Sequence, residues 1–431
     1  MCATARKDYG AAVSEDAIAW FRDTAFILGP FPTLSQTFIY RELDAMMELG
    51  LDVNVVSTGQ RQPEAAQMTD ALRAIQRSAL YLQYGSPRVI ASMAVQSSSR
   101  QVRQTMRWMM GFAHRTPAKR MRAAAAVLVA AHFAPTLRER GIRYVHSHFA
   151  GFQTEVAMSL SHLLGVPYGC TWHAYGIYRD RNILEQKLAG ALVVLTCTQS
   201  NVEHLRRLCP SAFDRIHLAY HGLDLAGIPE APPIAPDDVP VILAVGRIVA
   251  KKGFDHLVEA ASMLQQAGRS FEIRFIGEGP GRPGLEALVR KLGLRQHVTF
   301  LGAQPNAEVF HQMAAARVIA VPSVVTSKGD MDGLPNVVLE AMSMARPVVG
   351  SRVSGIPEVV LPGETGLLAK PGNARDLAAQ LGVLLEDPLV AQTLGRNAQE
   401  RIRHEFDVRQ NVRQVIRHIT ESLEAQTRMG R

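Results

Sequence analysis

Short apolar runs alternate with longer segments of helical periodicity along most of the chain. The segments between the runs, such as 37–49, 153–164 and 254–267, repeat apolar residues every three or four positions, which predicts amphipathic helices. Because strand and helix alternate, the pattern predicts parallel sheets covered by helices on both faces. The predicted strands are residues 25–31, 52–58, 143–149, 167–174, 191–197, 215–220, 241–247, 271–279, 298–302, 318–321 and 347–349.

A chain of 431 residues is too long for one hydrophobic core, so two domains are expected. A proline-rich stretch, HGLDLAGIPEAPPIAPDDVP, separates the two α/β halves and is typical of a linker. The first 23 or so residues are expected to form a loosely ordered leader. We therefore predict an N-terminal Rossmann-like domain over 1–226, a linker over 227–240, a second such domain over 241–405 and a final helix over 406–431.

The net charge of +8 is concentrated in a region predicted to be mostly helical, residues 70–140. Between Asp70 and Glu139 the chain has basic residues but no acidic ones. The part from Arg100 to Arg122 mixes these charges with tryptophan, methionine and phenylalanine, the composition of a helix lying on an anionic membrane. A solvated basic face and a nucleic-acid surface are the alternatives. No nucleic-acid-binding motif accompanies the charge, so we expect peripheral membrane contact and no nucleic-acid partner.

The cysteines Cys2, Cys170, Cys197 and Cys209 have neither C-x-x-C nor histidine-linked metal spacing, and are expected to be reduced thiols in a cytoplasmic protein. The N-terminus lacks an apolar core of signal-peptide length. Together with the basic region, these features predict a cytoplasmic protein that contacts the inner face of the cell membrane.

Polar residues follow several predicted strands, where ligands bind in doubly wound sheets. His146 and His148 alternate on one strand, but a third metal ligand is not evident, so we expect no metal there. His173 follows another strand, in WHAYGIY, and is either a site residue or a structural histidine. Ser35 and Gln36 are candidate acceptor or phosphate contacts, although Ser35 is also a suitable helix N-cap.

The most informative stretch is residues 322–342, PSVVTSKGDMDGLPNVVLEAM. After an apolar strand, it has a polar loop with Asp330 and Asp332, then Gly-Leu-Pro-Asn opening a helix that carries Glu340. The start of such a helix binds phosphate through its backbone N–H groups and dipole. A carboxylate on either side of a diphosphate can accept hydrogen bonds from sugar hydroxyls. The layout therefore matches a nucleotide sugar.

This stretch resembles the E-x7-E signature of the retaining glycosyltransferases of family 4, with Asp332 in place of the first Glu and Glu340 at the second. The strings GLPNVVLEAM, PVVGSRVSGIPEVV and TGLLAKPG are similar to the same family. FPTLSQTF resembles the FPxxSETF variant of its bacterial exopolysaccharide members, of the colanic-acid type.

The resemblance implies the GT-B fold: two Rossmann-like parallel-sheet domains facing a cleft, with a C-terminal helix that crosses back to the first domain. It also implies site roles. GRIVAKKG is similar to the family's diphosphate-binding pattern, which assigns that role to Arg247 and Lys252. Asp332 would hold donor sugar hydroxyls and Glu340 the ribose hydroxyls, while His173 would approach the sugar from the other domain. The family's Asp after that His is Ala174 here. Backbone N–H groups of Gly333, Leu334, Pro335 and Asn336 are the region expected to meet sugar and phosphate, Pro335 itself having no N–H.

The implied function is a hexosyltransferase that moves a sugar, with retained anomeric configuration, from a GDP- or UDP-hexose to a lipid-linked or growing polysaccharide in exopolysaccharide biosynthesis. No cofactor is expected, because fixed cations can stabilise the departing diphosphate. Asp330 and Asp332 also form a D-x-D, the metal-binding motif of the other glycosyltransferase architecture, GT-A. A nucleotide-sugar epimerase or hydrolase and a non-catalytic nucleotide-sugar-binding protein are the alternative functions.

Overall fold

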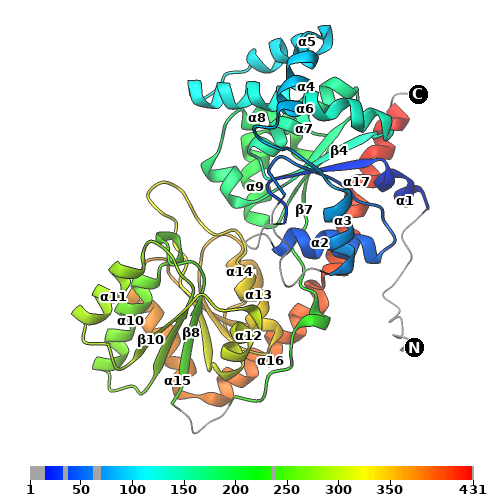
Figure 1. The fold of residues 1–431 in the computed structure, drawn as a ribbon. Helices are drawn as coiled ribbons and strands as arrows, with labels where there is room; N and C mark the ends of the chain where they lie inside the picture. Colours follow the sequence, from blue (N-terminus) through cyan, green and yellow to red (C-terminus); the bar gives the residue numbers. More distant parts are fainter. Residues whose placement is uncertain (1–14, 33–36, 62–68, 235–238, 430–431) are drawn as a thin grey trace. The chain divides into compact units, whose positions relative to one another are not determined.

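The computed structural model describes residues 15–32, 37–61, 69–234 and 239–429 (Figure 1). Its residues cluster by contact into two units. Among the described residues, the first comprises those up to Thr196, His204–Gly222 and those from Val408 onward, and the second comprises Cys197–Glu203 and those between Leu223 and Asp407. The domain boundaries expected from the sequence stay a prediction.

The described residues of the first unit form a seven-stranded parallel sheet in the order β3-β2-β1-β4-β5-β6-β7. The interior strand β1 is entirely buried and pairs with β2 on one side and β4 on the other, with Phe26 opposite Val55 and His146. The strands are β1 (Thr24–Leu28), β2 (Asn54–Ser57), β3 (Leu80–Tyr81), β4 (Tyr144–His148), β5 (Tyr168–Trp172), β6 (Val194–Thr196) and β7 (Ile216–Leu218).

Helices surround this sheet, and the last helix of the chain is one of them. In Figure 1 that helix, α17, is red and lies among the elements of the first unit. Its apolar residues Val412, Ile416 and Ile419 share a core with Phe26 of β1, and it packs against α1 and α2. The predicted return of the C-terminal helix to the first unit is confirmed. The helices are α1 (Glu15–Arg22), α2 (Thr37–Glu48), α3 (Asp70–Ser78), α4 (Pro87–Ser97), α5 (Arg100–Met110), α6 (Pro117–Glu139), α7 (Phe152–Leu164), α8 (Leu184–Gly190) and α17 (Val408–Met429).

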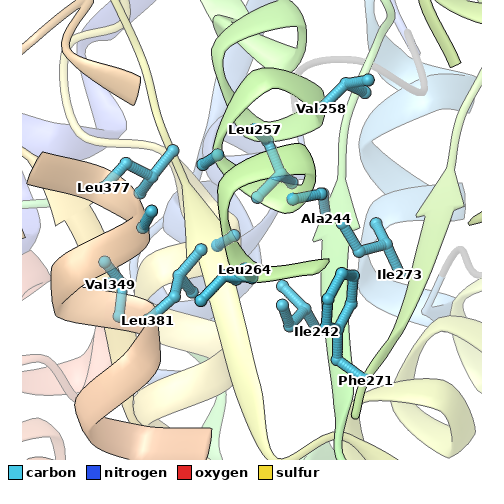
Figure 2. Close-up of a cluster of buried hydrophobic side chains, with 14 of the residues drawn as sticks. Ile242, Ala244, Leu257, Val258, Leu264, Phe271, Ile273, Val349, Leu377 and Leu381 are labelled. Atoms are coloured by element: carbon cyan, nitrogen blue, oxygen red, sulfur yellow. The ribbon is translucent and has the colours of Figure 1, made fainter. Parts of the chain in front are cut away.

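The second unit contains a six-stranded parallel sheet within its described residues, in the order β10-β9-β8-β11-β12-β13. Its core lies between the sheet and two helices, α10 (Phe254–Gln266) and α15 (Ala374–Glu386). Figure 2 shows Ile242 and Ala244 of β8 close to Leu257 and Leu264 of α10. The strands are β8 (Val241–Val245), β9 (Glu272–Ile276), β10 (Val298–Gly302), β11 (Val318–Val321), β12 (Val348–Ser351) and β13 (Gly366–Ala369).

The remaining helices are α9 (Gln199–Leu208), α10 (Phe254–Gln266), α11 (Arg282–Lys291), α12 (Asn306–Ala315), α13 (Asn336–Ser343), α14 (Ile356–Val359), α15 (Ala374–Glu386) and α16 (Pro388–Glu405). Helices and strands alternate throughout the second unit, as the hydrophobic pattern predicts. The fold class of two Rossmann-like parallel-sheet units is therefore confirmed.

The structure corrects the sequence analysis at three elements. Glu15–Arg22 form a helix, not part of a loosely ordered leader, because Ala17 and Phe21 are buried and α1 packs on α17. The strands β3 and β13 were not predicted. β3 has only two residues, and β13 pairs on one side only, at the edge of its sheet.

Both sheets have a switch point, where the strand order reverses direction. In the second unit β8, β9 and β10 run outward to one side, and β11 then returns to the other side of β8. In the first unit the same reversal places β4 beside β1. Ligands of such sheets bind outside the carboxyl ends of the strands at this point. The fold therefore directs attention to the loops after β8 and β11, and to those after β1 and β4.

Candidate functional site

The loops that follow β8 and β11 are in direct contact. Gly253 has a left-handed backbone with φ of 62°, and a Cβ atom on it would lie 2.1 Å from the carbonyl oxygen of Pro322. Glycine tolerates both the conformation and the close approach. The N–H of Val324 donates to the carbonyl of Lys251 at 2.9 Å. Lys251 and Lys252 are thereby held beside the polar loop that follows β11.

Asp332 and Lys252 form an ion pair at this junction. The ammonium of Lys252 lies 2.8 Å from Oδ2 of Asp332, the hydroxyl of Ser323 donates to the same oxygen at 2.9 Å, and Lys251 lies 3.5 Å from Oδ1. Burial opposes ionisation of Asp332, but Lys252, Lys251 and Ser323 outweigh it and hold the pKa of the carboxyl below its ordinary value. Asp332 is therefore a carboxylate at neutral pH, fixed by two lysines.

Asp330 shares one of these lysines. Its Oδ1 lies 3.5 Å from the ammonium of Lys251, which thus lies between the two carboxylates of the D-x-D sequence. The loop is braced by Thr326, whose hydroxyl accepts from the N–H of Asp330 at 3.0 Å and whose N–H donates to the carbonyl of Asp330 at 2.9 Å. Both carboxylates are consequently oriented toward fixed protein cations.

Helix α13 begins directly after this loop. Pro335 is its N-cap residue and supplies no side-chain acceptor, so the helix begins at Asn336, slightly later than the sequence suggested. The carbonyl of Gly333 accepts a hydrogen bond from the N–H of Gly355 at 3.0 Å. This bond connects the loop before α13 to the residue at which α14 begins. Leu334 is buried beneath it. Glu340 is half-buried, one turn inside the helix.

The structure thus brings Lys252 and Asp332 together at the N-terminus of α13, called here the mouth of α13. The residues that lead into this end of the helix are Gly333, Leu334, Pro335 and Asn336. Arg247 lies two residues beyond the end of β8, is exposed, and forms no ion pair with another described residue. Sequence reasoning chose Lys252 and not its neighbour Lys251, and it missed Ser323. The Lys-Lys doublet was the available signal, but a doublet does not reveal which ammonium turns toward which carboxylate.

His173 belongs to the first unit, immediately after β5. Its ring lies between Phe38 and Phe149, at centroid distances of 4.7 Å from each, and is 4.9 Å from the ring of His221. Burial, followed by the nearby His221 and His148, holds the pKa of His173 well below its ordinary value. The imidazole is therefore neutral at physiological pH. The predicted approach of His173 to the donor sugar stays a prediction.

The first unit also contains a buried ionic network. Glu155 and Lys187 both have fully buried side chains, and the ammonium lies 3.1 Å from Oε1 of Glu155. Arg122 pairs with Glu155 at 2.6 Å and also with Asp180, which follows the π-helix η2 (Tyr175–Arg179). Lysine and arginine together hold the pKa of Glu155 below its ordinary value against the opposing effect of burial. The network fixes the segment that follows His173.

This network changes the interpretation of the basic region. Arg122 belongs to the ionic network, as does Lys119, which lies 2.8 Å from Asp180. The apolar side of α5 faces the protein, since Met109 is buried and Trp108 stacks on His162 at a centroid distance of 4.8 Å. The apolar residues of α5 are therefore largely explained by internal packing.

The other candidate residues have different surroundings. His146 is bonded through both ring nitrogens, to the hydroxyls of Tyr144 at 3.0 Å and Thr171 at 2.8 Å. Ser35 and Gln36 lie outside the described residues, as does Cys2.

The cysteines Cys170, Cys197 and Cys209 are free and buried. Within the described ranges, the structure contains no helix with the length and apolar character needed to cross a membrane.

Comparison with known proteins gives the family. The family model "Glycosyl transferases group 1" matches residues 230–401, which include the Lys252–Asp332 pair and α13. Alpha-D-kanosaminyltransferase from Streptomyces kanamyceticus is 30% identical over 288 residues, which make up 61% of this chain and 72% of that protein. The chain belongs to the group 1 glycosyl transferases.

Two further similarities concern a biosynthetic relative and the fold. The putative colanic acid biosynthesis glycosyltransferase WcaL of Escherichia coli K12 is 33% identical over 201 residues, which cover 46% of this chain and about half, 49%, of WcaL. Sucrose-phosphate synthase from Thermosynechococcus elongatus has a similar structure, with a TM-score of 0.71 and 20% identity over 93% of this chain and 99% of that one. The glycosyltransferase has the GT-B fold, and its likeness to WcaL agrees with the exopolysaccharide resemblance of its sequence.

Proposed function

We propose that this glycosyltransferase moves a hexose from a nucleotide diphosphate sugar to a lipid-linked or growing polysaccharide, with retention of the anomeric configuration. The observation that carries the proposal is the Lys252–Asp332 pair at the mouth of α13, on the switch point of the second sheet. A cation, a carboxylate and a helix N-terminus at one strand edge suit a ligand that carries both phosphates and hydroxyls.

The chemistry assigns a part to each group. Cleavage of the sugar–phosphate bond leaves negative charge on the departing diphosphate, and fixed cations with N–H donors stabilise that charge. Lys252 supplies a point charge and Arg247 a planar, exposed fork that is available to a ligand. Asp332 accepts hydrogen bonds from sugar hydroxyls, and Glu340 accepts them from the ribose. Donor binding requires Lys252 to share its charge between Asp332 and the phosphates.

The surroundings of the D-x-D sequence support transfer without a divalent ion. The ammonium of Lys251 lies 3.5 Å from both Asp330 and Asp332, and Lys252 lies 2.8 Å from Asp332. A divalent cation bound by these oxygens would meet two positive charges at close range, which repel it. We therefore propose that lysines, not a metal ion, balance the charge of the donor.

We propose that the acceptor is presented at the inner face of the cell membrane. Support comes from exposed arginines on and after α5, and from exposed apolar side chains on the neighbouring helix: Ile90 is 59% and Val95 68% exposed, both on α4. Met121, at the start of α6, is 74% exposed. Figure 1 shows α4, α5 and α6 gathered at one end of the first unit. Apolar residues flanked by arginines are typical of a surface that rests on anionic lipid.

The proposal is tested with purified protein, UDP- or GDP-hexoses and a lipid-linked saccharide acceptor in buffer with EDTA. We expect a glycosylated product whose new linkage, examined by NMR, has the anomeric configuration of the donor. Asp332→Asn should remove most of the turnover. Hydrolysis with water as the only acceptor would support the alternative of a hydrolase, and an inverted product would refute retention.

A further inference from the structure

The first unit has its own group of polar side chains at the switch point between β1 and β4. His148 ends β4, His173 follows β5, and Glu42 lies on α2, the first helix after β1. All three are buried. Phe38 and Phe149 lie against His173, and Phe26 lies 6.5 Å from the ring of His148. Three ionisable side chains therefore occupy a largely aromatic environment.

Several polar atoms of this group lack a partner among the described residues. These are both ring nitrogens of His148, both ring nitrogens of His173, and Oε1 of Glu42. His146, on the same strand, has both nitrogens bonded. A buried polar atom without a partner lowers the stability of the fold, because it has lost its hydrogen bonds to water. Side chains kept at that cost indicate a role other than stability.

Glu42 and His148 lie within reach of one another. Oε1 of Glu42 is 3.6 Å from Nε2 of His148, slightly longer than a hydrogen bond. The His148 ring in turn lies nearly parallel to that of His173, with an angle of 11° between the planes and 6.2 Å between centroids. His148 thus connects a buried carboxyl group to the predicted site histidine.

We propose that Glu42 is a positioning residue of the transfer reaction, which acts through His148 to fix the orientation of His173. This inference rests on the proposed function together with the role that the family resemblance implies for His173, an approach to the donor sugar. As a neutral carboxyl, Glu42 donates its O–H to Nε2 of His148, which places the ring proton of His148 on Nδ1. His148 is then held as one tautomer in one plane and presents a fixed face to His173.

The charges in this environment make the arrangement sensitive to pH. Burial raises the pKa of Glu42 to about 8. Burial and His221 lower the pKa of His148 to about 3, and burial with Arg41 lowers that of His221 to about 4. His146 on β4 is likewise held well below its ordinary value, mainly by burial. These histidines are neutral at pH 7, so the charge change expected between pH 7 and 9 is that of Glu42.

Burial keeps three neighbouring groups neutral in this range: Tyr40, Tyr144 and Cys197, whose Sγ lies within 4.8 Å of ring nitrogens of His173 and His221 and whose pKa is raised to about 12. Tyr40 on α2 has a pKa raised by burial, which keeps its hydroxyl neutral. Tyr144 on β4 is shifted in the same direction, also mainly by burial. Arg409 of α17 is paired with Glu48 of α2 at 2.8 Å. Ionised Glu42 can only accept a hydrogen bond, so the ring proton of His148 moves to Nε2, and the tautomer that His148 presents to His173 changes as the pH rises.

The test compares pH profiles of kcat for the full chain between pH 6.5 and 9.5. Wild-type turnover should fall above about pH 8, by about tenfold for each further pH unit. Glu42→Gln retains a neutral N–H donor and should keep its turnover across the range. Glu48→Gln, on the same helix but in the ion pair with Arg409, serves as the matched control and should follow the wild type. The same alkaline decline in Glu42→Gln as in the wild type would overturn the proposal.

A second variant guards against a folding defect in Glu42→Gln. His148→Asn removes the imidazole through which Glu42 is proposed to act, so its profile should also lack the alkaline decline, at reduced kcat. Combining the two substitutions should then cost little more than His148→Asn alone, whereas independent effects would multiply and contradict the proposal. His173→Ala separates a failure of the role of His173 in transfer from a failure of the role of Glu42. Full turnover in His173→Ala would remove its role in the proposed function, whereas an inactive His173→Ala with an unchanged Glu42→Gln profile would remove only the role of Glu42.

Discussion

Replacing Lys187 by methionine should destabilise the first unit strongly. The side chain is fully buried, and its ammonium donates to the carbonyl of Ala150 at 2.7 Å and to Oε1 of Glu155 at 3.1 Å. Methionine fills similar space but leaves the carbonyl without its donor and Glu155 with less positive charge nearby. Breaking a buried ion pair by removing one partner costs about 3–5 kcal/mol.

The structure favours the lower end of that range. Glu155 keeps Arg122 at 2.6 Å and the amide of Asn182 at 3.0 Å, so its carboxylate still has two partners in the variant. We therefore expect a loss of about 3 kcal/mol. For a folding unit of roughly 150–250 residues, each kcal/mol lowers the midpoint by about 2–4 °C, which gives a shift of about 6–12 °C.

Thermal unfolding followed by circular dichroism measures this shift. Lys291→Met makes the same chemical change at an exposed position on α11, where surface substitutions stay within about 0.5 kcal/mol. Lys187 also holds the carbonyl of Ala150, the residue after Phe149 beside His173. Turnover of Lys187→Met should accordingly fall even where the variant is folded. A midpoint within 2 °C of the wild type would show that the network contributes little, and would refute this reasoning.

Three further outcomes are expected. Glu340→Ala should lose most turnover while unfolding at nearly the wild-type temperature, and near-normal kcat would exclude its role at the ribose. The lysines lower the pKa of Asp332 in the folded state below the unfolded value of about 3.9, so the stability that its carboxylate contributes is present at neutral pH and is lost as the pH falls through the folded pKa. The free energy of unfolding should therefore drop more between pH 4 and 2 in the wild type than in Asp332→Asn. Parallel curves for the two proteins would contradict the ion pair. Ile90→Asp with Val95→Asp should weaken sedimentation with anionic phosphatidylglycerol vesicles at least about tenfold without changing turnover on a soluble acceptor, and unchanged sedimentation would exclude α4 as the contact.

Much of the fold could be predicted because its signals are local. The strand at Val318–Val321 is an uninterrupted apolar run, and α9 carries a clear helical period. α1 escaped because its stability comes from α17, nearly 400 residues away in the chain. No local pattern in residues 15–22 indicates that packing partner.

The candidate site was predictable to a similar extent. The position of Asp332 just before a helix indicated that it lies beside the helix N-terminus, because phosphate and sugar sites at helix starts have a recognisable order of residues. The roles of Lys251 and Ser323 depend on how two loops fold against each other. Glu42 has the sequence appearance of a solvent-exposed charge on an amphipathic helix, and only the packing of α2 shows that it is buried. Among the basic residues after α3, Arg122 is paired with buried carboxylates, which no local pattern in the sequence reveals.

Binding of donor sugars to wild type and Lys252→Met in EDTA tests the central claim most directly. Calorimetry with UDP- and GDP-hexoses should show binding to the wild type without any metal. Loss of a charged partner at a desolvated contact costs about 2 kcal/mol or more, so Lys252→Met should bind at least roughly thirtyfold more weakly, with Lys291→Met unchanged. Equal affinity in Lys252→Met and wild type, or wild-type binding that requires manganese, would contradict a site built from fixed lysines at the mouth of α13.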